Sequence, residues 1–257
     1  MISLIIPNYN NAIFLDRLFN SIFFQTYKDY EIIFVDDVST DESLKIAERW
    51  RQDHFSDKMK IITLKEKRWN GGARNVGLDA RSLNSDYTMF IDSDDWFSDN
   101  YCFEYIINLI KENNYPDLVR LSYYWCGSEI RLVELDQKTP QEIVKGCDVA
   151  CWTKCIKSNL MVKFPENTLM EDVVQHIKQL DIIKTVAVCL KGICCWNRKN
   201  PNSCSTNAKL QNEKWLSSLY RFYADLLDLT VNTQYCKNER ERRLKLVEES
   251  IKFNMGG

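Results

Sequence analysis

Apolar and polar positions follow a regular rhythm in the first hundred residues of the chain. Short runs of branched apolar residues, typical of β-strands, alternate with longer segments in which apolar residues recur at helical spacing. The four predicted strands are Ser3–Pro7, Glu31–Asp37, Lys60–Leu64 and Thr88–Asp94. Because strands that alternate with helices form parallel sheets with right-handed crossovers, we predict an α/β fold with a mainly parallel sheet flanked by helices.

The segments between these strands carry helix signals. Residues 10–26 place apolar side chains on one face of a helix. The next helix has Ser39 or Thr40 as its candidate cap, followed by Asp41 and Glu42, which we expect in its first turn because the helix dipole favours carboxylates there.

Later elements are predicted from weaker patterns. We expect helices around Gly77–Ser82 and at Asp99–Asn113, Cys147–Ser158 and Met170–Leu180, a strand at 117–126, and one strand or a hairpin at 185–198. Residues 209–254 alternate apolar and charged residues in helical fashion. This pattern predicts a mostly helical C-terminal extension.

Composition and charge narrow the class of protein. The chain has 257 residues, of which 45% are hydrophobic and 27% charged, so it can bury a large core. A net charge of −2 gives no overall electrostatic reason to expect nucleic acid or an anionic membrane as a partner. The start "MISLIIPNYN" lacks a basic region, and no segment reaches about 18 apolar residues. We therefore expect a cytoplasmic protein without a transmembrane segment, or one peripheral to the inner face of the membrane.

Ten cysteines raise the question of disulfides or zinc. The chain has no C-x-x-C pair, and its two histidines, His54 and His176, complete no zinc pattern. Without a secretory signal, reduced thiols that pack as small apolar side chains are the expectation.

An acidic cluster follows the fourth predicted strand. Asp92-Ser93-Asp94 places two carboxylates one residue apart where the chain leaves the sheet. Hard divalent cations prefer such oxygen ligands, and a cation there could also bind the phosphate oxygens of a nucleotide. An exposed acidic turn or a helix cap would have the same pattern.

Polar residues also follow the first two strands. Asp36 and Asp37 end the second strand, and Asn8, Tyr9 and Asn10 follow Pro7 in the first. Parallel strands bring these ends to one edge of the sheet, where such folds bind ligands. A carboxylate there could accept from a uracil imide or a ribose hydroxyl, and the Tyr9 ring could stack on a base; caps and turns are the alternative.

Two further segments carry candidate chemistry. In "NGGARNVGL", Gly71 and Gly72 allow close backbone approach in a loop, and the Arg74 guanidinium suits a phosphate or a base carbonyl; neither G-x-G-x-x-G nor a P-loop is present. Glu171 and Asp172 open a predicted helix, where a carboxylate could act as a general base or could only complement the helix dipole.

Together these segments resemble the family-2 glycosyltransferases of the GT-A fold. The resemblance covers residues 1 to about 205 and keeps the family's order of motifs. It implies a glycosyltransferase domain at 1–205, with a nucleotide-binding half at 1–100 and an acceptor half at 101–205, followed by the helical extension at 206–257. It is carried by "SLIIPNYN", "VDDVSTDES", "GGARNVGL", "FIDSDDWF", "CWTKCIKSNLMVKFPENTLMED" and "WNRKNPNSCS".

The resemblance implies a role for each site residue. The nucleotide would be held by Pro7, Asn8, Tyr9, Asp36, Asp37, Arg74, Asp92 and Ser93. Asp94, with Asp92, would hold a divalent cation, Mn²⁺ or Mg²⁺. Asp172 would be the catalytic base that deprotonates the acceptor hydroxyl, with Glu171 as the alternative.

The activity implied by the resemblance is inverting transfer of one sugar from a nucleotide diphosphate sugar, expected to be a UDP-sugar. The acceptor would be a hydroxyl of a glycan, a lipid-linked or another acceptor, in surface-glycan or lipid-linked oligosaccharide synthesis. Processive relatives carry Q-x-x-R-W, whereas "QNEKW" at 211–215 has lysine in place of arginine, so we expect a single transfer. The alternatives are a nucleotidyltransferase, a non-catalytic nucleotide-sugar-binding protein, or transfer to modified nucleic-acid bases.

Overall fold

The computed structural model describes residues 1–146, 148–166, 168, 170–200, 203 and 212–255, with the backbone alone for 212–216 and 253–255. The strands are β1 Ile2–Asn8, β2 Tyr30–Asp36, β3 Met59–Thr63, β4 Tyr87–Phe90, β5 Trp96–Phe97, β6 Leu118–Cys126, β7 Ile130–Val133, β8 Lys154–Lys157 and β9 Val186–Asn197. The α-helices are α1 Ala12–Phe23, α2 Ser43–His54, α3 Trp69–Asp79, α4 Cys102–Glu112, α5 Pro140–Lys145, α6 Glu171–Leu180, α8 Asn212–Asp228 and α9 Gln234–Met255.

One mixed sheet runs through the molecule in the strand order β3-β2-β1-β4-β8-β6-β9-β5, with β7 paired to β6. The four strands predicted in the first hundred residues correspond to β1, β2, β3 and β4, and they are parallel to one another. In the second half, β8 is antiparallel to both β4 and β6, whereas β9 is parallel to β6. The predicted α/β class is confirmed. All strand pairs among β1 to β4 are parallel, whereas the second half of the chain combines parallel and antiparallel pairs.

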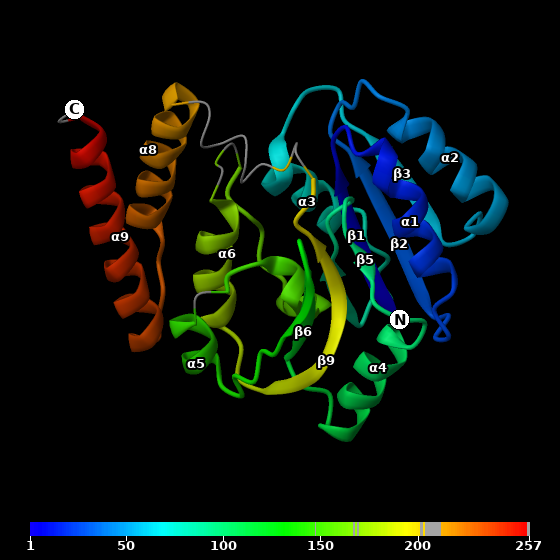
Figure 1. Cartoon of the computed structure of the whole chain (residues 1–257). Coiled ribbons are helices and arrows are strands. Elements are labelled where there is room, and N and C mark those ends of the chain that lie inside the picture. Colours follow the sequence, from blue (N-terminus) through cyan, green and yellow to red (C-terminus); the bar gives the residue numbers. More distant parts are fainter. Residues whose placement is uncertain (147, 167, 169, 201–202, 204–211, 256–257) are drawn as a thin grey trace.

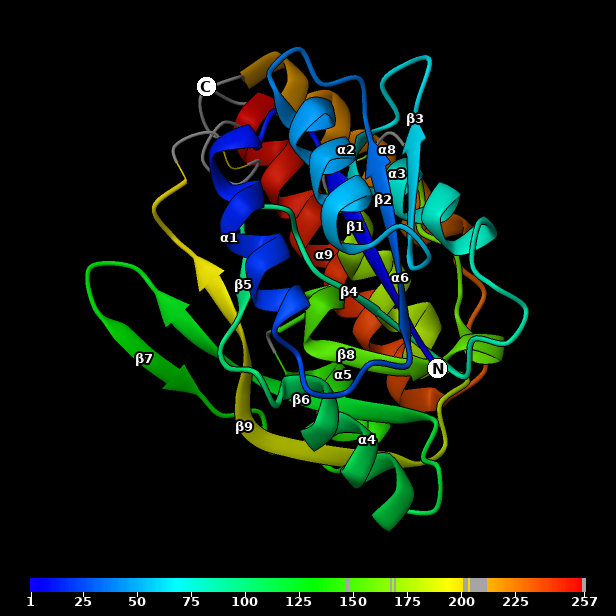
Figure 2. The same cartoon turned by 90° about the vertical axis from the view of Figure 1, so that its right-hand side faces the viewer.

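The strand order reverses between β1 and β4, and this reversal positions the site. From β1 to β3 the chain proceeds in one direction across the sheet, and α1 and α2 lie together in front of it in Figure 2. From β3 the chain crosses back through α3 to β4, on the other side of β1. Right-handed crossovers therefore put α3 on the opposite face, and open α/β sheets bind their ligands at such a reversal, here at the carboxyl ends of β1 and β4.

Two apolar clusters form the core. The larger one unites the sheet with α1 to α4, because the strands bury both faces; every residue of β1 and β2 is buried. The second joins α5, α6, α8 and α9, and Figure 1 shows α8 and α9 as an adjacent pair beside α6. The predicted helical character of the C-terminal part is confirmed for the described residues 212–255.

Two helix starts differ from prediction. The helix expected around Gly77–Ser82 already begins at Trp69, so the glycine-rich segment is helical and not a loop. The second helix begins at Ser43, so its cap position is Glu42 and not Ser39 or Thr40, and neither Asp41 nor Glu42 lies in its first turn. The Asp41 carboxylate instead accepts hydrogen bonds from the backbone N–H of Ser43 at 3.0 Å and of Ala12, the first residue of α1, at 2.9 Å. The bond to Ala12 joins the segment before α2 to the start of α1, so local propensity could not predict it.

The segment predicted as a helix at Cys147–Ser158 is mostly extended. A 3₁₀ turn at Cys151–Thr153 leads into β8, which fills the sheet between β4 and β6; Cys147 itself lies outside the described residues. Pairing on both edges of β8 outweighs the weak helical pattern of this segment. The cysteines other than Cys147 and Cys204, which are not described, are buried free thiols, as expected from their packing role.

Within the described residues, no helix combines the length and the apolar character that crossing a membrane requires.

Candidate active site

The ends of β1 and β2 are tied together by the polar residues predicted there. The Asn8 amide donates to the Asp36 carboxylate at 3.0 Å and to the Ser39 hydroxyl at 3.1 Å. The backbone N–H of Ser39 donates to the other Asp36 oxygen at 3.0 Å. Asn8 and Asp36 are buried, as is Pro7. This network fixes the conformation of the strand ends. The next residue, Tyr9, is 44% exposed.

Asp37 holds the start of α3. Its two carboxylate oxygens accept hydrogen bonds from the backbone N–H groups of Arg68, at 2.7 Å, and Trp69, at 2.9 Å. These N–H groups belong to the unpaired first turn of a helix, so the carboxylate satisfies them and complements the helix dipole. This bond explains why α3 begins eight residues before the predicted Gly77. A role of Asp37 toward a nucleotide stays a prediction.

Arg74 lies at the centre of the site. Its side chain is 2% exposed, and its guanidinium donates to three carboxylates: Glu171 at 2.8 Å, Asp172 at 2.9 Å and Asp92 at 2.9 Å. One residue of α3 therefore joins the acidic turn after β4 to the start of α6. The fork of five donors makes arginine suited to such a junction. The sequence suggested Arg74 as a nucleotide ligand and gave no sign of these partners.

Close contacts between α3 and the segment before α6 set the position of Asp172. A Cβ atom on Gly71 would lie 2.4 Å from the Pro165 carbonyl oxygen, so only glycine allows this approach. The Asn75 amide donates to the Phe164 carbonyl and accepts from the Phe164 N–H, both at 2.9 Å. Sequence reasoning missed Asn75, although it follows Arg74 in the quoted motif.

Burial raises the pKa of both carboxyls at the start of α6. The pKa of Glu171 is raised to about 7, first by burial and then by the charge of Asp172, against the opposing effect of Arg74. Burial also raises the pKa of Asp172, which Arg74 opposes. The Asp172 side chain is 25% exposed and that of Glu171 only 8%. Asp172 is thus the more accessible of the two candidate bases.

The acidic turn lies beyond the end of β4. This strand ends at Phe90, whereas the sequence predicted that it would extend to Asp94. The Asp94 carboxylate accepts from the Asn200 amide at 2.7 Å, and the Ser93 hydroxyl accepts from the Asn11 amide at 2.8 Å. Burial and the nearby charge of Asp92 raise the pKa of Asp94 to about 6. Negative charge therefore exceeds positive charge around Asp94.

This surplus of negative charge fits a divalent cation at Asp92 and Asp94. In the part of the chain that is described, no three His, Cys, Asp or Glu side chains are arranged to hold a metal by themselves. Mg²⁺ and similar hard cations are commonly held by one or two carboxylates together with water and the phosphates of a substrate. The residues present match that mode of binding and not a metal site made by the protein alone.

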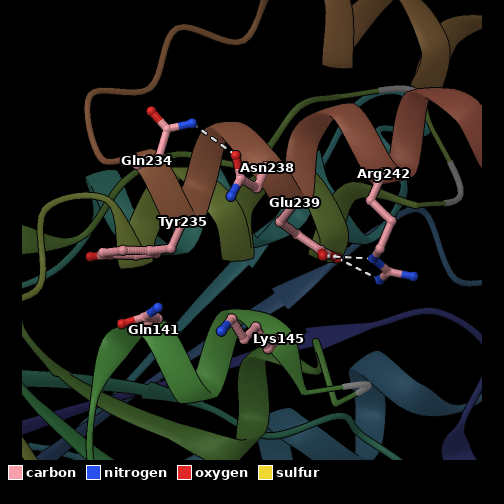
Figure 3. Close-up of a pocket in the computed structure, with 7 residues that line it drawn as sticks. All are labelled: Gln141, Lys145, Gln234, Tyr235, Asn238, Glu239 and Arg242. Carbon is pink, nitrogen blue, oxygen red and sulfur yellow. Dashed lines mark hydrogen bonds and ion pairs between the residues drawn. The ribbon is translucent and has the colours of Figure 1, made fainter.

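A separate cleft of about 470 Å³ lies between α5 and α9 (Figure 3). It is lined by Gln141, Lys145, Gln234, Tyr235, Asn238, Glu239 and Arg242. The Arg242 guanidinium is paired with Glu239 at 2.7 Å, and the Gln234 amide donates to Asn238. None of these residues belongs to the set at the strand ends.

Named relatives of the chain are glycosyltransferases. Glycosyltransferase GlyA of Streptococcus pneumoniae is 26% identical and covers 91% of this chain, but this chain spans only about a third (35%) of GlyA. The Escherichia coli protein WfgD, named as a UDP-Glc:alpha-D-GlcNAc-diphosphoundecaprenol beta-1,3-glucosyltransferase, is 26% identical, with 64% of this chain and 63% of WfgD covered.

Solved structures share the fold. TarS 1-349 of S. aureus in complex with UDP-GlcNAc matches with a TM-score of 0.75 and 20% identity, covering 93% of this chain and 70% of the TarS 1-349 chain. The mannosyltransferase PcManGT of Pyrobaculum calidifontis, in complex with GDP-Man and Mn²⁺, matches with a TM-score of 0.67 and 15% identity, covering 99% and 73%. These likenesses establish the fold, which agrees with the GT-A type expected.

The family itself is established by the sequence. The model of the family described as "Glycosyl transferase family 2" matches residues 3–169. That range begins in β1 and includes the strand ends, the acidic turn after β4 and α3 with Arg74. The chain belongs to glycosyl transferase family 2.

Proposed function

We propose that the protein is an inverting glycosyltransferase that moves one sugar from a nucleotide diphosphate sugar to an acceptor hydroxyl. The proposal rests chiefly on one observation: Arg74 brings Asp92 of the acidic turn and Asp172 of α6 within hydrogen-bond distance of a single guanidinium. A carboxylate that is a candidate for the diphosphate site and a carboxylate that is a candidate base thus share one cation. Inversion needs both groups near the anomeric carbon, because the acceptor hydroxyl is deprotonated on one side of that carbon while the diphosphate leaves on the other.

Each candidate site residue would have a separate role. Tyr9 and Asp37 would bind the base of the nucleotide, while Asn8 and Asp36 would keep the strand ends in shape. Asp172 would take the proton from the acceptor hydroxyl as the new bond forms. A carboxylate whose pKa is raised is a stronger base than an ordinary one, provided that it stays ionised at the working pH.

A divalent cation would be held by Asp94 and Asp92. When bound, it would neutralise charge on the departing diphosphate. Arg74 would keep Asp92 in place for this role, and the Asn200 amide would orient Asp94.

For the donor we propose a UDP-sugar, and for the acceptor a lipid-linked or surface-glycan hydroxyl. The names of WfgD and of the TarS complex, which mention a UDP-sugar, support the donor. The name of WfgD, which mentions a diphosphoundecaprenol acceptor, supports the acceptor class.

The decisive experiment is a screen of nucleotide sugars for transfer and donor hydrolysis, with and without Mn²⁺. Absence of both activities with every donor would favour a non-catalytic binding protein.

Asp94→Ala is expected to abolish the effect of metal on nucleotide binding. In the wild type, UDP should bind more tightly with Mn²⁺ or Mg²⁺ than with a chelator, because the cation joins the diphosphate to Asp94. Calorimetry measures both affinities, and Asp57→Ala, which removes an exposed carboxylate elsewhere, is the control. Equal UDP affinity with metal and with chelator in the wild type would remove the cation from the proposal.

The base site is expected to prefer UDP to GDP and ADP, and Asp37→Ala should largely lose that preference. Sites built on hydrogen bonds discriminate strongly, because a wrong ligand leaves buried polar groups unpaired. Competition binding with the three diphosphates measures the preference. If GDP binds most tightly, the uracil assignment is wrong while the fold and the catalytic residues are unaffected.

A further inference from the structure

The loop before α3 places a lysine between two aromatic side chains at the predicted base site. The Lys67 ammonium lies 2.5 Å from the centroid of the Tyr9 ring and 5.8 Å from the centroid of the Trp69 ring. It also lies 3.5 Å from the Asp37 carboxylate. Tyr9 and Trp69 are 44% and 36% exposed, so both rings are accessible from solvent. Neither Lys67 nor Trp69 was predicted as a site residue.

The backbone around these side chains is held in an unusual conformation. Asn10, Val38 and Trp69 have φ angles of 51°, 63° and 60°, in the left-handed region that favours glycine. They follow β1, follow β2 and begin α3, so three separate segments are strained at one edge of the sheet. Such strain persists only where the surroundings impose it, and it gathers at ligand sites. For Trp69, the surroundings include the hydrogen bond from its N–H to Asp37.

The Tyr9 and Trp69 rings both lie near the same ammonium group. The separation of their centroids cannot exceed the total of the two distances to the Lys67 ammonium, 2.5 Å and 5.8 Å. A base that stacks on an aromatic ring lies about 3.5 Å from it. The ammonium on Tyr9 lies closer than that, so a base cannot stack on the same face of Tyr9 until Lys67 moves away.

We propose that Trp69 is a second aromatic surface of the base site and that Lys67 occupies the space for the base until a nucleotide displaces it. This inference rests on the proposed nucleotide-sugar function and adds two residues that determine base binding. In the absence of nucleotide, the ammonium is stabilised by the Tyr9 ring and by Asp37. The incoming base replaces the contact with Tyr9 by stacking, which aromatic side chains provide to any base.

The first test measures how UDP and inorganic pyrophosphate bind to Trp69→Leu, by calorimetry with Mg²⁺. Loss of one stacking partner should weaken UDP binding about 5- to 150-fold and leave pyrophosphate binding unchanged, because pyrophosphate has no base. Trp69→Phe should retain most of the affinity. The control is Tyr101→Leu, which removes an exposed ring outside this loop. Melting temperatures verify that each variant is folded.

The second test replaces Lys67 with methionine, which keeps the apolar stem and removes the ammonium. UDP should bind about two- to fivefold more tightly, because a cation–π contact no longer competes with the base. Lys65→Met removes an exposed positive charge from the same loop, so it corrects for the general effect of charge on a diphosphate. Weaker or unchanged UDP binding in Lys67→Met, relative to Lys65→Met, would show that Lys67 does not compete.

Failure of the inference differs from failure of the proposed function. A wild-type protein that binds no nucleoside diphosphate overturns the proposed function, and this inference with it. A wild-type protein that binds UDP, together with a folded Trp69→Leu variant of unchanged UDP affinity, overturns the inference alone.

Discussion

Asp172→Asn is expected to lower the rate of sugar transfer by about 10²–10⁴-fold while donor binding stays nearly unchanged. An acceptor hydroxyl is a poor nucleophile, and general-base assistance contributes about this factor. Asparagine keeps the size of the side chain and can still accept a hydrogen bond from Arg74, which donates to Asp172 at 2.9 Å. It cannot take a proton. Single-turnover rates with the identified acceptor, together with calorimetry of the donor, separate the two effects.

Glu171→Gln is the matched control for Asp172→Asn. Both carboxyls accept from the same guanidinium nitrogen of Arg74, yet Glu171 is the more buried and belongs to the packing between α3 and α6. Its amide variant should lower transfer less than Asp172→Asn does. Transfer at the wild-type rate by Asp172→Asn would mean that Asp172 only complements the dipole of α6. A larger loss of transfer rate in Glu171→Gln than in Asp172→Asn would assign the base to Glu171.

Arg74→Met is expected to lower the free energy of unfolding by about 3–5 kcal/mol, the range found when one partner of a buried ion pair is removed. Methionine matches the apolar stem but leaves Glu171, Asp172 and Asp92 without their shared cation. Urea unfolding measures the loss. Arg49→Met, which breaks an exposed pair with Asp16, is the control and should cost at most about 1 kcal/mol.

The same variant should also change the pH dependence of transfer. Arg74 stabilises the ionised form of Asp172 and so lowers its pKa, against the effect of burial. Without Arg74 the pKa rises, the base is protonated at higher pH, and the acidic limb of the rate profile moves upward in pH. Arg74→Lys keeps a positive charge and should shift the limb less, which allows this test if Arg74→Met does not fold. An unfolding free energy within 1 kcal/mol of wild type and an unmoved limb would contradict the central role of Arg74.

The sequence by itself determined the elements whose signals are local. Runs of branched apolar residues predicted β1, β2 and β3 to within one residue at each end, because a buried parallel strand needs such a run whatever surrounds it. The start of α6 was predicted equally well. The sequence also placed Asp36 and the acidic turn at strand ends, and a parallel sheet then brings them to one edge.

Only the tertiary structure decided which groups those residues contact. The partners of Arg74 lie 18, 97 and 98 positions away along the chain, and those of Asp37 lie 31 and 32 positions away. Hydrophobic periodicity and local propensity carry no information about such distant pairs, which form only when the crossover through α3 folds back onto the sheet. For the same reason α3 began earlier than its sequence predicted and β8 became a strand. The carboxylate of Asp37, which follows β2, outweighed the local preference in the first case, and two neighbouring strands did so in the second.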